Sequence, residues 1–227
     1  MKILVTSGGT SERIDQVRSI ANHSTGLLGK IITETLLQEG HQVTLVTTKK
    51  AVKPPKHDRL TIHEIFDTAD LLQCMENLVK SHDVLIHSMA VSDYTPVYMT
   101  GLDEVRETDD LTSLLDKHNT ENKISSKEEV QVLFLKKTPK IISLVKDWNP
   151  AIHLIGFKLL VDVAKEELLA VARESLHKNQ ADTIVANDLT QIKNGKHLAY
   201  LVSENGYQTA TSKEEIAQML AQKIQEL

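Results

Sequence analysis

Hydrophobic positions in the first 90 residues follow two alternating patterns. Short apolar runs of strand length, such as "KILVTS" at 2–7, alternate with longer segments in which apolar residues recur at helical spacing. We therefore expect strands at 2–7, 41–48, 59–65 and 83–90, and helices at 26–40 and 68–81. Gly40 and Thr68 have the residue types of a helix C-cap and N-cap. The pattern indicates strand and helix in alternation.

The alternation is interrupted after residue 90. "VSDYTPVY" predicts a loop, and the polar stretch that follows is too long for an ordinary connection, so we expect a mobile flap over about residues 95–129. The pattern then resumes with expected strands at 130–137, 152–158 and 182–190 and helices at 138–148, begun by Thr138 and Pro139, and 163–179. Asn205-Gly206 between alternating residues predicts a type I′ hairpin, and "SKEE" from Ser212 predicts a capping box on a final helix.

Together these elements predict an α/β protein. We expect a Rossmann-like, doubly wound, mostly parallel sheet with helices on both faces, a C-terminal β-hairpin and the mobile flap. No internal repeat and no linker-like composition divides the sequence. One domain spanning residues 1–227 is therefore expected.

Composition indicates a globular protein and narrows its partners. Hydrophobic residues make up 41% of the 227 residues, which is enough for a sizeable core. The net charge of -5 argues against nucleic acid as a partner. No long apolar run and no signal-peptide pattern is present, so we expect no membrane association and a cytoplasmic location. The single cysteine, Cys74, is expected at a buried helix position rather than as a nucleophile.

Small and polar residues gather where the expected strands end, which is where open α/β sheets bind ligands. "SGGT", "SMAVSDY", "GFK" and "ANDLT" are the four such places. A helix beginning near Ser24-Thr25-Gly26 would offer free N–H groups and the positive end of its dipole to a phosphate. Equally, Ser24 could simply cap the helix while the glycines let it pack closely. Asn22, just before it, is either a turn residue or a donor to a carbonyl or oxyanion.

Several common motifs are missing from the sequence. Gly29-Lys30 is followed by Ile31, so a Walker A loop is excluded, and no G-x-G-x-x-G fingerprint supports a nicotinamide cofactor. Neither a metal-ligand spacing among the ten histidines nor a G-x-S-x-G nucleophile motif is found. These absences argue against a built-in transition-metal site and leave no evidence for serine hydrolase chemistry.

The segments "TSGGTSERIDQVRSIANHSTG", "MAVSDY", "NKISS", "LVKDW", "GFKL" and "VANDLT", in this order, resemble the phosphopantothenate-cysteine ligase family. The resemblance covers almost the whole chain and corresponds to a stand-alone ligase. It implies that a nucleoside triphosphate activates the carboxylate of 4′-phosphopantothenate as an acyl-nucleotidylate. The cysteine amine then forms the amide, in coenzyme A biosynthesis.

The resemblance also implies roles for individual residues. Asn22 and Lys123 would be catalytic, Asn22 orienting the acyl carbonyl and Lys123 closing over the triphosphate from the flap. Substrate contacts would come from the first glycine-rich segments: Gly9, Asn22, Ser24, Thr25 and Gly26. Nucleotide contacts would come from later segments: Ser88, Met89, Asp93, Pro139, Lys140, Ile141, Ile142, Phe157 and Lys178. Mg²⁺ is expected on the triphosphate, with its protein ligands unknown.

The sequence departs from the family pattern in ways that matter for specificity. The flap motif reads "KISSK", and Lys123 follows Asp93 by 30 positions (123 minus 93), a longer interval than in many bacterial relatives. "LVKDW" and "GFKL" resemble the eukaryotic, ATP-using branch; we nevertheless expect CTP to be preferred, with ATP possible. The family further implies a homodimer and a possible decarboxylase partner. Two alternative functions stay open: an NADP-dependent reductase, and a non-catalytic nucleotide-binding partner of a decarboxylase.

Overall fold

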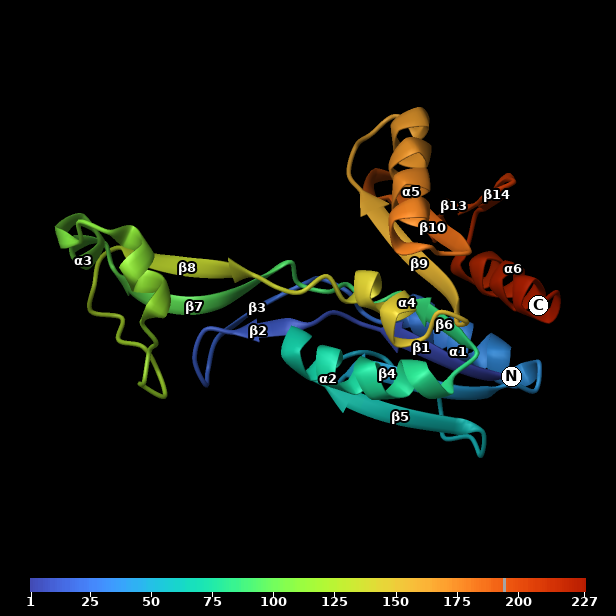
Figure 1. Cartoon of the computed structure of the whole chain (residues 1–227), viewed down its shortest axis with the longest axis horizontal. Helices are drawn as coiled ribbons and strands as arrows, with labels where there is room; N and C mark the ends of the chain where they lie inside the picture. The colour runs from blue at the N-terminus through green and yellow to red at the C-terminus, as the bar shows by residue number, and fades with distance from the viewer. Residues whose placement is uncertain (194) are drawn as a thin grey trace.

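The computed structural model describes residues 1–193 and 195–227. An eight-stranded sheet in the order β14-β13-β10-β9-β6-β1-β4-β5 forms its centre (Figure 1). Strands β5 to β10 of this order are parallel, and the hairpin β13–β14 is added antiparallel at one edge. The strands are β1 Lys2–Ser7, β4 Gln42–Thr48, β5 Leu60–Ile65, β6 Val84–His87, β9 His153–Leu160, β10 Thr183–Asp188, β13 Ala199–Ser203 and β14 Gly206–Ala210. The predicted Rossmann-like sheet with a C-terminal hairpin is confirmed.

Helices cover both faces of the sheet. α1 (Leu27–Gln38) and α6 (Lys213–Gln225) pack on one face, and α2 (Thr68–Leu78), α4 (Val145–Trp148) and α5 (Lys165–Asn179) pack on the other. Each face has its own buried cluster because successive strand residues point to opposite sides. In β1, Ile3 and Val5 belong to the cluster with α1 and α6, and Leu4 to the opposite one. None of the described helices is long and apolar enough to span a membrane.

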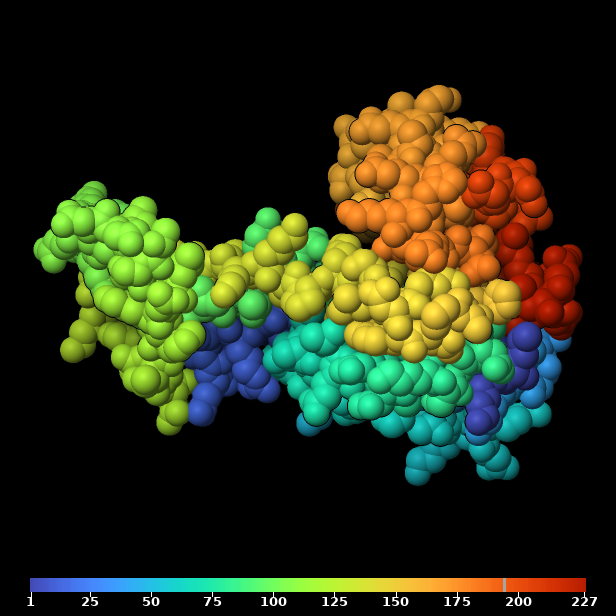
Figure 2. All heavy atoms as spheres, viewed as in Figure 1, coloured from blue at the N-terminus to red at the C-terminus, as the bar shows by residue number. Residues whose placement is uncertain are grey.

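Residues 94–137 extend away from the sheet as a separate projection, which we call the arm (Figures 1 and 2). It consists of β7 (Tyr94–Gly101), paired antiparallel with β8 (Gln131–Lys137), with α3 (Leu102–Glu107) and the 3-10 helix η2 (Leu111–Asp116) between them. The expected loop at 91–98 is therefore wrong in its second half, where β7 begins. Residues 95–129, expected as a flap, contain most of β7 and both short helices.

Polar contacts to one carboxylate, that of Glu104, join the elements near the end of the arm. The Glu104 carboxylate accepts hydrogen bonds from the Tyr98 and Thr100 hydroxyls, and from Lys117 Nζ at 2.6 Å. These donors, Lys117 first, lower the pKa of Glu104 to about 2. The Tyr98 ring stacks on Phe134 with 6.5 Å between ring centroids. One carboxylate thus connects β7, α3 and the segment after η2.

Four small elements were not expected from the pattern. β2 (Ser11–Arg13) and β3 (Ser19–Ala21) form a hairpin between β1 and α1, and β11 (Ile192–Lys193) pairs with β12 (Lys196–His197). Each strand has only two or three residues, which is too short to give a readable alternation. The 3-10 turns η1 (Val79–Ser81), η3 (Ile141–Leu144) and η4 (Leu189–Gln191) complete the described elements.

Two helix starts differ from the predictions because side chains have tertiary partners. The Thr68 hydroxyl donates to Glu12 Oε1 at 2.7 Å, so Asp67 caps α2 instead by accepting from the Asp70 amide. Thr138 does not cap a helix either: its hydroxyl donates to the Ser92 carbonyl at 2.6 Å. The expected helix at 138–148 is replaced by η3 followed by the single turn α4.

The C-terminal hairpin forms as expected, but its turn differs. The two loop residues are Glu204 and Asn205, because Ser203 pairs with Gly206. Neither loop residue has a positive φ, which both positions of a type I′ turn require; Gly206 has φ 133°. In the capping box, Ser212 Oγ accepts from the Glu215 amide at 3.1 Å, while Glu215 Oε2 accepts from the Thr211 amide rather than from Ser212.

Candidate functional site

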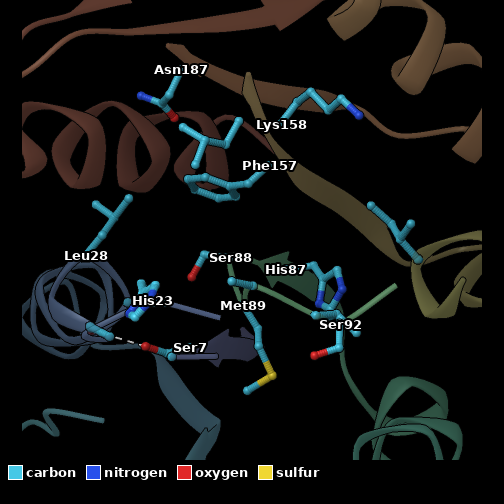
Figure 3. A pocket seen from close by; sticks show the side chains of 18 of the residues that line it. Ser7, His23, Leu28, His87, Ser88, Met89, Ser92, Phe157, Lys158 and Asn187 are labelled. Carbon is cyan, nitrogen blue, oxygen red and sulfur yellow. Dashed lines mark hydrogen bonds between the residues drawn. The ribbon is translucent and has the colours of Figure 1, made fainter. Parts of the chain in front are cut away.

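A cavity of about 530 Å³ opens at the carboxyl ends of β1, β6, β9 and β10 (Figure 3). β1 and β6 are neighbours in the sheet; the chain continues from β1 to β4 and β5 on one side, and from β6 to β9 and β10 on the other. The cavity therefore lies at the topological switch point of the fold. Figure 3 shows Phe157 and Asn187 across the opening from Ser7, Ser88 and Met89. The four strand ends expected to carry ligand contacts are therefore brought together.

The floor of the cavity is a close approach between β1 and the start of α1. Ser7 Oγ donates to the Gly26 carbonyl at 3.1 Å. A Cβ on Gly29 would lie 2.3 Å from Ser7 Oγ, so no side chain fits at this helix position. Gly8 and Gly26 have φ of 83° and 78°, a conformation that favours glycine. These glycines let the backbone of both segments reach the cavity.

The N-terminus of α1 faces this floor. The helix begins at Leu27, one residue later than expected, with Gly26 as N-cap and no side-chain cap; Ser24 therefore does not cap it. The Thr25 hydroxyl instead accepts from the Leu27 amide at 3.3 Å. Leu28 and Gly29 of the first turn line the cavity. An uncapped first turn leaves N–H groups and the positive dipole end directed at a bound anion.

His87, at the end of β6, is buried beside Thr6 of β1. The Thr6 hydroxyl lies 2.8 Å from His87 Nδ1 and also accepts from the Met89 amide at 3.2 Å. Burial, with a smaller effect of Lys140, lowers the pKa of His87 to about 4. The imidazole is neutral at pH 7, and the Thr6 hydroxyl that it contacts also accepts from the Met89 amide.

An ion pair stands at the opposite rim. Lys140 Nζ lies 3.0 Å from Asp93 Oδ1, and both side chains are more than 60% exposed. The Thr138 amide and hydroxyl are bonded to the carbonyls of Asp93 and Ser92, so the two segments move together. A solvated pair of this kind can exchange its partners for a ligand at small cost.

The far wall contains residues that the sequence analysis missed. Lys158, His197 and Lys213 line the cavity, together with Ser175 and Asn179 of α5. His197 is buried, its Nδ1 has no partner among the described residues, and burial with Lys213 lowers its pKa to about 4. The "GFK" and "ANDLT" strand ends signalled Lys158 and Asn187. His197 lies in the two-residue strand β12 and Lys213 opens the helix α6, so neither follows the end of a readable parallel strand.

Most of the predicted site residues line this cavity. They are Ser24, Thr25, Gly26, Ser88, Met89, Asp93, Pro139, Lys140, Ile141, Ile142 and Phe157. Two others lie at its edge: Gly9 forms a β-bridge with Ala90, and Asn22 Nδ2 donates to the Ala90 carbonyl at 3.1 Å. Lys178, on α5, is exposed and outside the lining, so its nucleotide contact stays a prediction.

Lys123 is also outside the lining. It is exposed and lies in the arm between Asn122 and Ile124, which are both bonded to the turn of the β2–β3 hairpin. That hairpin leads directly into Asn22. The two residues predicted to be catalytic are thus connected to the same short hairpin.

The described residues contain no cluster of three or more His, Cys, Asp or Glu side chains suited to a metal ion. Cys74 lies on α2, away from the cavity lining, and burial raises the pKa of its thiol.

Comparison with known proteins places the chain in a family. The model of the DNA/pantothenate metabolism flavoprotein C-terminal domain (DFP) matches residues 1–227. The coenzyme A biosynthesis bifunctional protein CoaBC of Thermococcus kodakarensis is 30% identical over 230 residues, covering 100% of this chain and 51% of the relative. CoaBC of Methanocaldococcus jannaschii is 29% identical over 229 residues with the same coverage. The chain spans about half the length of these curated relatives.

Solved structures agree with this comparison. A DNA/pantothenate metabolism flavoprotein from Streptococcus pneumoniae is 65% identical, with a TM-score of 0.96 over 100% of this chain and 99% of that one. The C-terminal domain of CoaBC is 25% identical with a TM-score of 0.72, covering 98% and 93%. Cab2, solved as its H337A mutant with phosphopantothenate-cysteine, shares the fold at 17% identity and a TM-score of 0.74 over 98% and 86%. With its whole length matched, this chain belongs to the family of the DNA/pantothenate metabolism flavoprotein C-terminal domain.

Proposed function

We propose that this protein is a ligase that joins 4′-phosphopantothenate to cysteine, using a nucleoside triphosphate, in coenzyme A biosynthesis. The observation that carries the proposal is a single cavity lined by three distant segments: 24–26 at the start of α1, 88–93 after β6, and 139–142 with Phe157. These are the segments that resemble the ligase family. Relatives matched over the whole chain are coenzyme A biosynthesis proteins.

The reaction has two displacement steps. A carboxylate oxygen of 4′-phosphopantothenate attacks the α-phosphorus of the nucleotide, and pyrophosphate leaves. The cysteine amine then attacks the acyl carbon, an amide bond forms, the nucleoside monophosphate leaves and the amine loses a proton. Neither step needs a protein nucleophile. Positioning and stabilisation of negative charge are sufficient, and the cavity offers means for both.

Each region of the cavity suits one part of this chemistry. The first turn of α1 presents N–H groups to a phosphate, and the Asn22 amide at the edge can donate to the acyl carbonyl. Asp93 and the backbone at Ser88-Met89 lie where a nucleoside would be held, opposite Phe157. Lys123 would approach the triphosphate from the arm, where a flexible ammonium can follow charge onto the departing pyrophosphate.

The finer assignments belong to the same proposal. CTP is preferred over ATP, and Mg²⁺ enters bound to the triphosphate.

The active species is a homodimer that uses the arm, on which Leu111, Val130 and Leu135 are 49%, 49% and 42% exposed. A decarboxylase partner would supply the activity of the remaining half of the bifunctional relatives. Light scattering of the full chain, with and without Leu135→Lys, tests the dimer: the variant should be monomeric.

Product analysis by mass spectrometry tests the reaction itself. The protein is incubated with 4′-phosphopantothenate, cysteine and Mg²⁺, with CTP and ATP in parallel reactions. We expect phosphopantothenoylcysteine, pyrophosphate and the nucleoside monophosphate in equal amounts, formed faster with CTP. Nucleotide binding without product would instead indicate a non-catalytic partner of a decarboxylase, and product formed faster with ATP would reverse the nucleotide preference.

A further inference from the structure

The turn of the β2–β3 hairpin holds the segment around Lys123 from both sides. On one side, the Gln16 amide donates to the Asn122 carbonyl at 3.1 Å, and Gln16 Nε2 donates to Asn122 Oδ1 at 2.7 Å. On the other side, the Ile124 amide donates to Asp15 Oδ2 at 3.2 Å, and Arg18 Nη2 donates to the Ile124 carbonyl at 3.1 Å. These contacts join residues more than 100 positions apart in the chain.

Asp15 is the centre of this arrangement, and its two oxygens have separate tasks. Oδ1 accepts from the Val17 and Arg18 amides at 2.8 and 2.7 Å and so shapes the turn. Oδ2 accepts from Arg18 Nε and Nη2 at 3.0 and 2.6 Å, as well as from Ile124. The Asp15 side chain has no exposed area, and these donors, Arg18 first, lower the pKa of its carboxyl.

We propose that Asp15 and Arg18 are positioning residues for Lys123. The inference rests on the proposed function, in which Lys123 meets the triphosphate. Asn122 and Ile124 are fixed by the hairpin, and Ile124 is only 6% exposed, whereas the Lys123 side chain between them is exposed. The backbone of Lys123 is therefore ordered before substrate binds, while its ammonium stays free to reach for charge. Ordering in advance lowers the entropy lost in the transition state.

The same hairpin explains how this segment is coupled to the cavity. From Arg18 the chain runs through β3 to Asn22, whose amide donates to the Thr10 carbonyl and whose side chain donates to the Ala90 carbonyl. The hairpin is thus held at the cavity edge at one end and holds the Lys123 segment at the other. Loosening its turn should affect Lys123 without moving the cavity floor.

Asp15→Asn is the variant that tests the proposal. The amide oxygen can keep the Oδ1 contacts of the turn, while the NH₂ group in place of Oδ2 cannot accept from Arg18 or Ile124. Asp103→Asn is the matched control, since Asp103 pairs with Arg106 at the same i,i+3 spacing in the arm but both side chains are largely exposed. Gln16→Ala, at an exposed position, tests the other side of the arrangement without a buried change.

For Asp15→Asn we expect kcat to fall about tenfold, with KM values within about twofold of the parent protein. In a Lys123→Gln background, the same change should cost nothing further, because it acts through Lys123. Gln16→Ala should lower kcat in the same direction, and Asp103→Asn should have no effect. A raised KM for 4′-phosphopantothenate with kcat unchanged, or an additive loss in the Lys123→Gln background, would overturn the proposal in favour of a direct substrate contact by Arg18.

Limited trypsin digestion separates this inference from the proposed function. Cleavage after Lys123 should be faster in Asp15→Asn than in the parent protein and unchanged in Asp103→Asn. If the parent protein makes no product while Asp15→Asn still speeds this cleavage, the ligase proposal fails and the holding of the segment stands. Unchanged cleavage in both Asp15→Asn and Gln16→Ala would refute the positioning role whatever the activity.

Discussion

The sheet around the cavity and the arm differ in what holds them together. Leu4, Val5 and Leu85 of the central strands are fully buried between two helical layers. In the arm, all of which lies within the described residues, Leu114 and Ile124 are the only buried hydrophobic side chains. Its other contacts include a two-stranded ladder, one aromatic stack and hydrogen bonds to Glu104, Asp15, Gln16 and Arg18. Burial holds the cavity floor rigid, while the arm depends on polar groups that can exchange partners.

This difference matters for the proposed reaction, in which negative charge moves from the triphosphate to the departing pyrophosphate. Acyl transfer needs fixed donors where the substrate binds, and the cavity floor can supply them because close packing prevents rearrangement. In that reaction the pyrophosphate leaves, so the Lys123 ammonium that would accompany it has to move. An arm with little buried surface can open at a small free-energy cost. We therefore predict that substitutions in the sheet lower the free energy of unfolding, whereas substitutions in the arm mainly change its local order.

The largest effect is expected in the sheet. Leu85→Ala removes a fully buried side chain from β6 and should lower the free energy of unfolding by about 2–5 kcal/mol. Leu115→Ala in the arm, where the side chain is 38% exposed, should change it by less than about 0.5 kcal/mol. Urea denaturation followed by circular dichroism measures both. Similar losses for the two variants would mean that the arm and the sheet share one core.

Gly29→Ala should have the next largest effect, because its Cβ would lie 2.3 Å from Ser7 Oγ and 2.4 Å from Ser7 Cβ. We expect a loss of about 1–3 kcal/mol in the free energy of unfolding and weaker binding of 4′-phosphopantothenate. Ser7→Gly removes both clashing atoms. The loss of stability in the double variant should therefore be smaller than the sum of the losses in the two single variants. A strictly additive result would show that the close approach of α1 to β1 does not cause the loss in Gly29→Ala.

The next effect in size is expected in the pH dependence of the free energy of unfolding. His87 has a folded pKa of about 4 and an unfolded value near 6.5, so the unfolded chain binds the extra proton between these values. Stability is therefore complete above about pH 6.5 and falls as the pH decreases towards 4. Within that window the slope contributed by His87 approaches about 1.4 kcal/mol per pH unit, and His197 adds a contribution of the same sign. Replacing His87 with Gln should remove its share, as measured by urea denaturation across pH 4–8.

The smallest effect is expected at Glu104. Its folded pKa is lowered, so its stabilising contacts are present above its unfolded value near 4.5 and are lost as the pH falls towards about 2. Glu104→Gln should leave global unfolding nearly unchanged but increase amide exchange at residues 98–117. Hydrogen exchange with mass spectrometry checks this, with Glu34→Gln, in the partly exposed Lys30–Glu34 pair of α1, as control. If amide exchange in the arm is the same in Glu104→Gln as in the parent protein, the order of the arm depends on the β7–β8 ladder alone.

Much of the cavity could be predicted from sequence because strand ends are readable. Apolar runs that end in "SGG", "HSMA" or "GFK" identify both the strand and the residue that follows it, and parallel strands place those residues along one edge. Lys213 and His197 could not be found in this way. Lys213 opens the final helix and His197 lies in a two-residue strand, so only the packing of α6 and β12 beside the cavity brings them there.

The starts of the helices show a second limit. Thr68 and Thr138 both have the local character of N-caps, yet each hydroxyl donates to a partner distant in sequence, Glu12 and Ser92. A cap contributes about 1 kcal/mol, an amount that one tertiary hydrogen bond can offset. Local propensity therefore predicted the presence of α2 correctly but not its first residue, and it overstated the helix after Thr138.

By itself, the sequence determined the strand and helix alternation, the parallel sheet and the polar strand ends that line the cavity, because these depend on side-chain periodicity and local turn chemistry. Only the tertiary structure decided that residues 94–137 form an arm, that Gly29 packs against Ser7, and that Asp15 and Arg18 meet Asn122 and Ile124. The reason is physical. Polar contacts between residues 100 positions apart leave no periodic signal, since a hydrogen bond needs only one donor and one acceptor to meet in space.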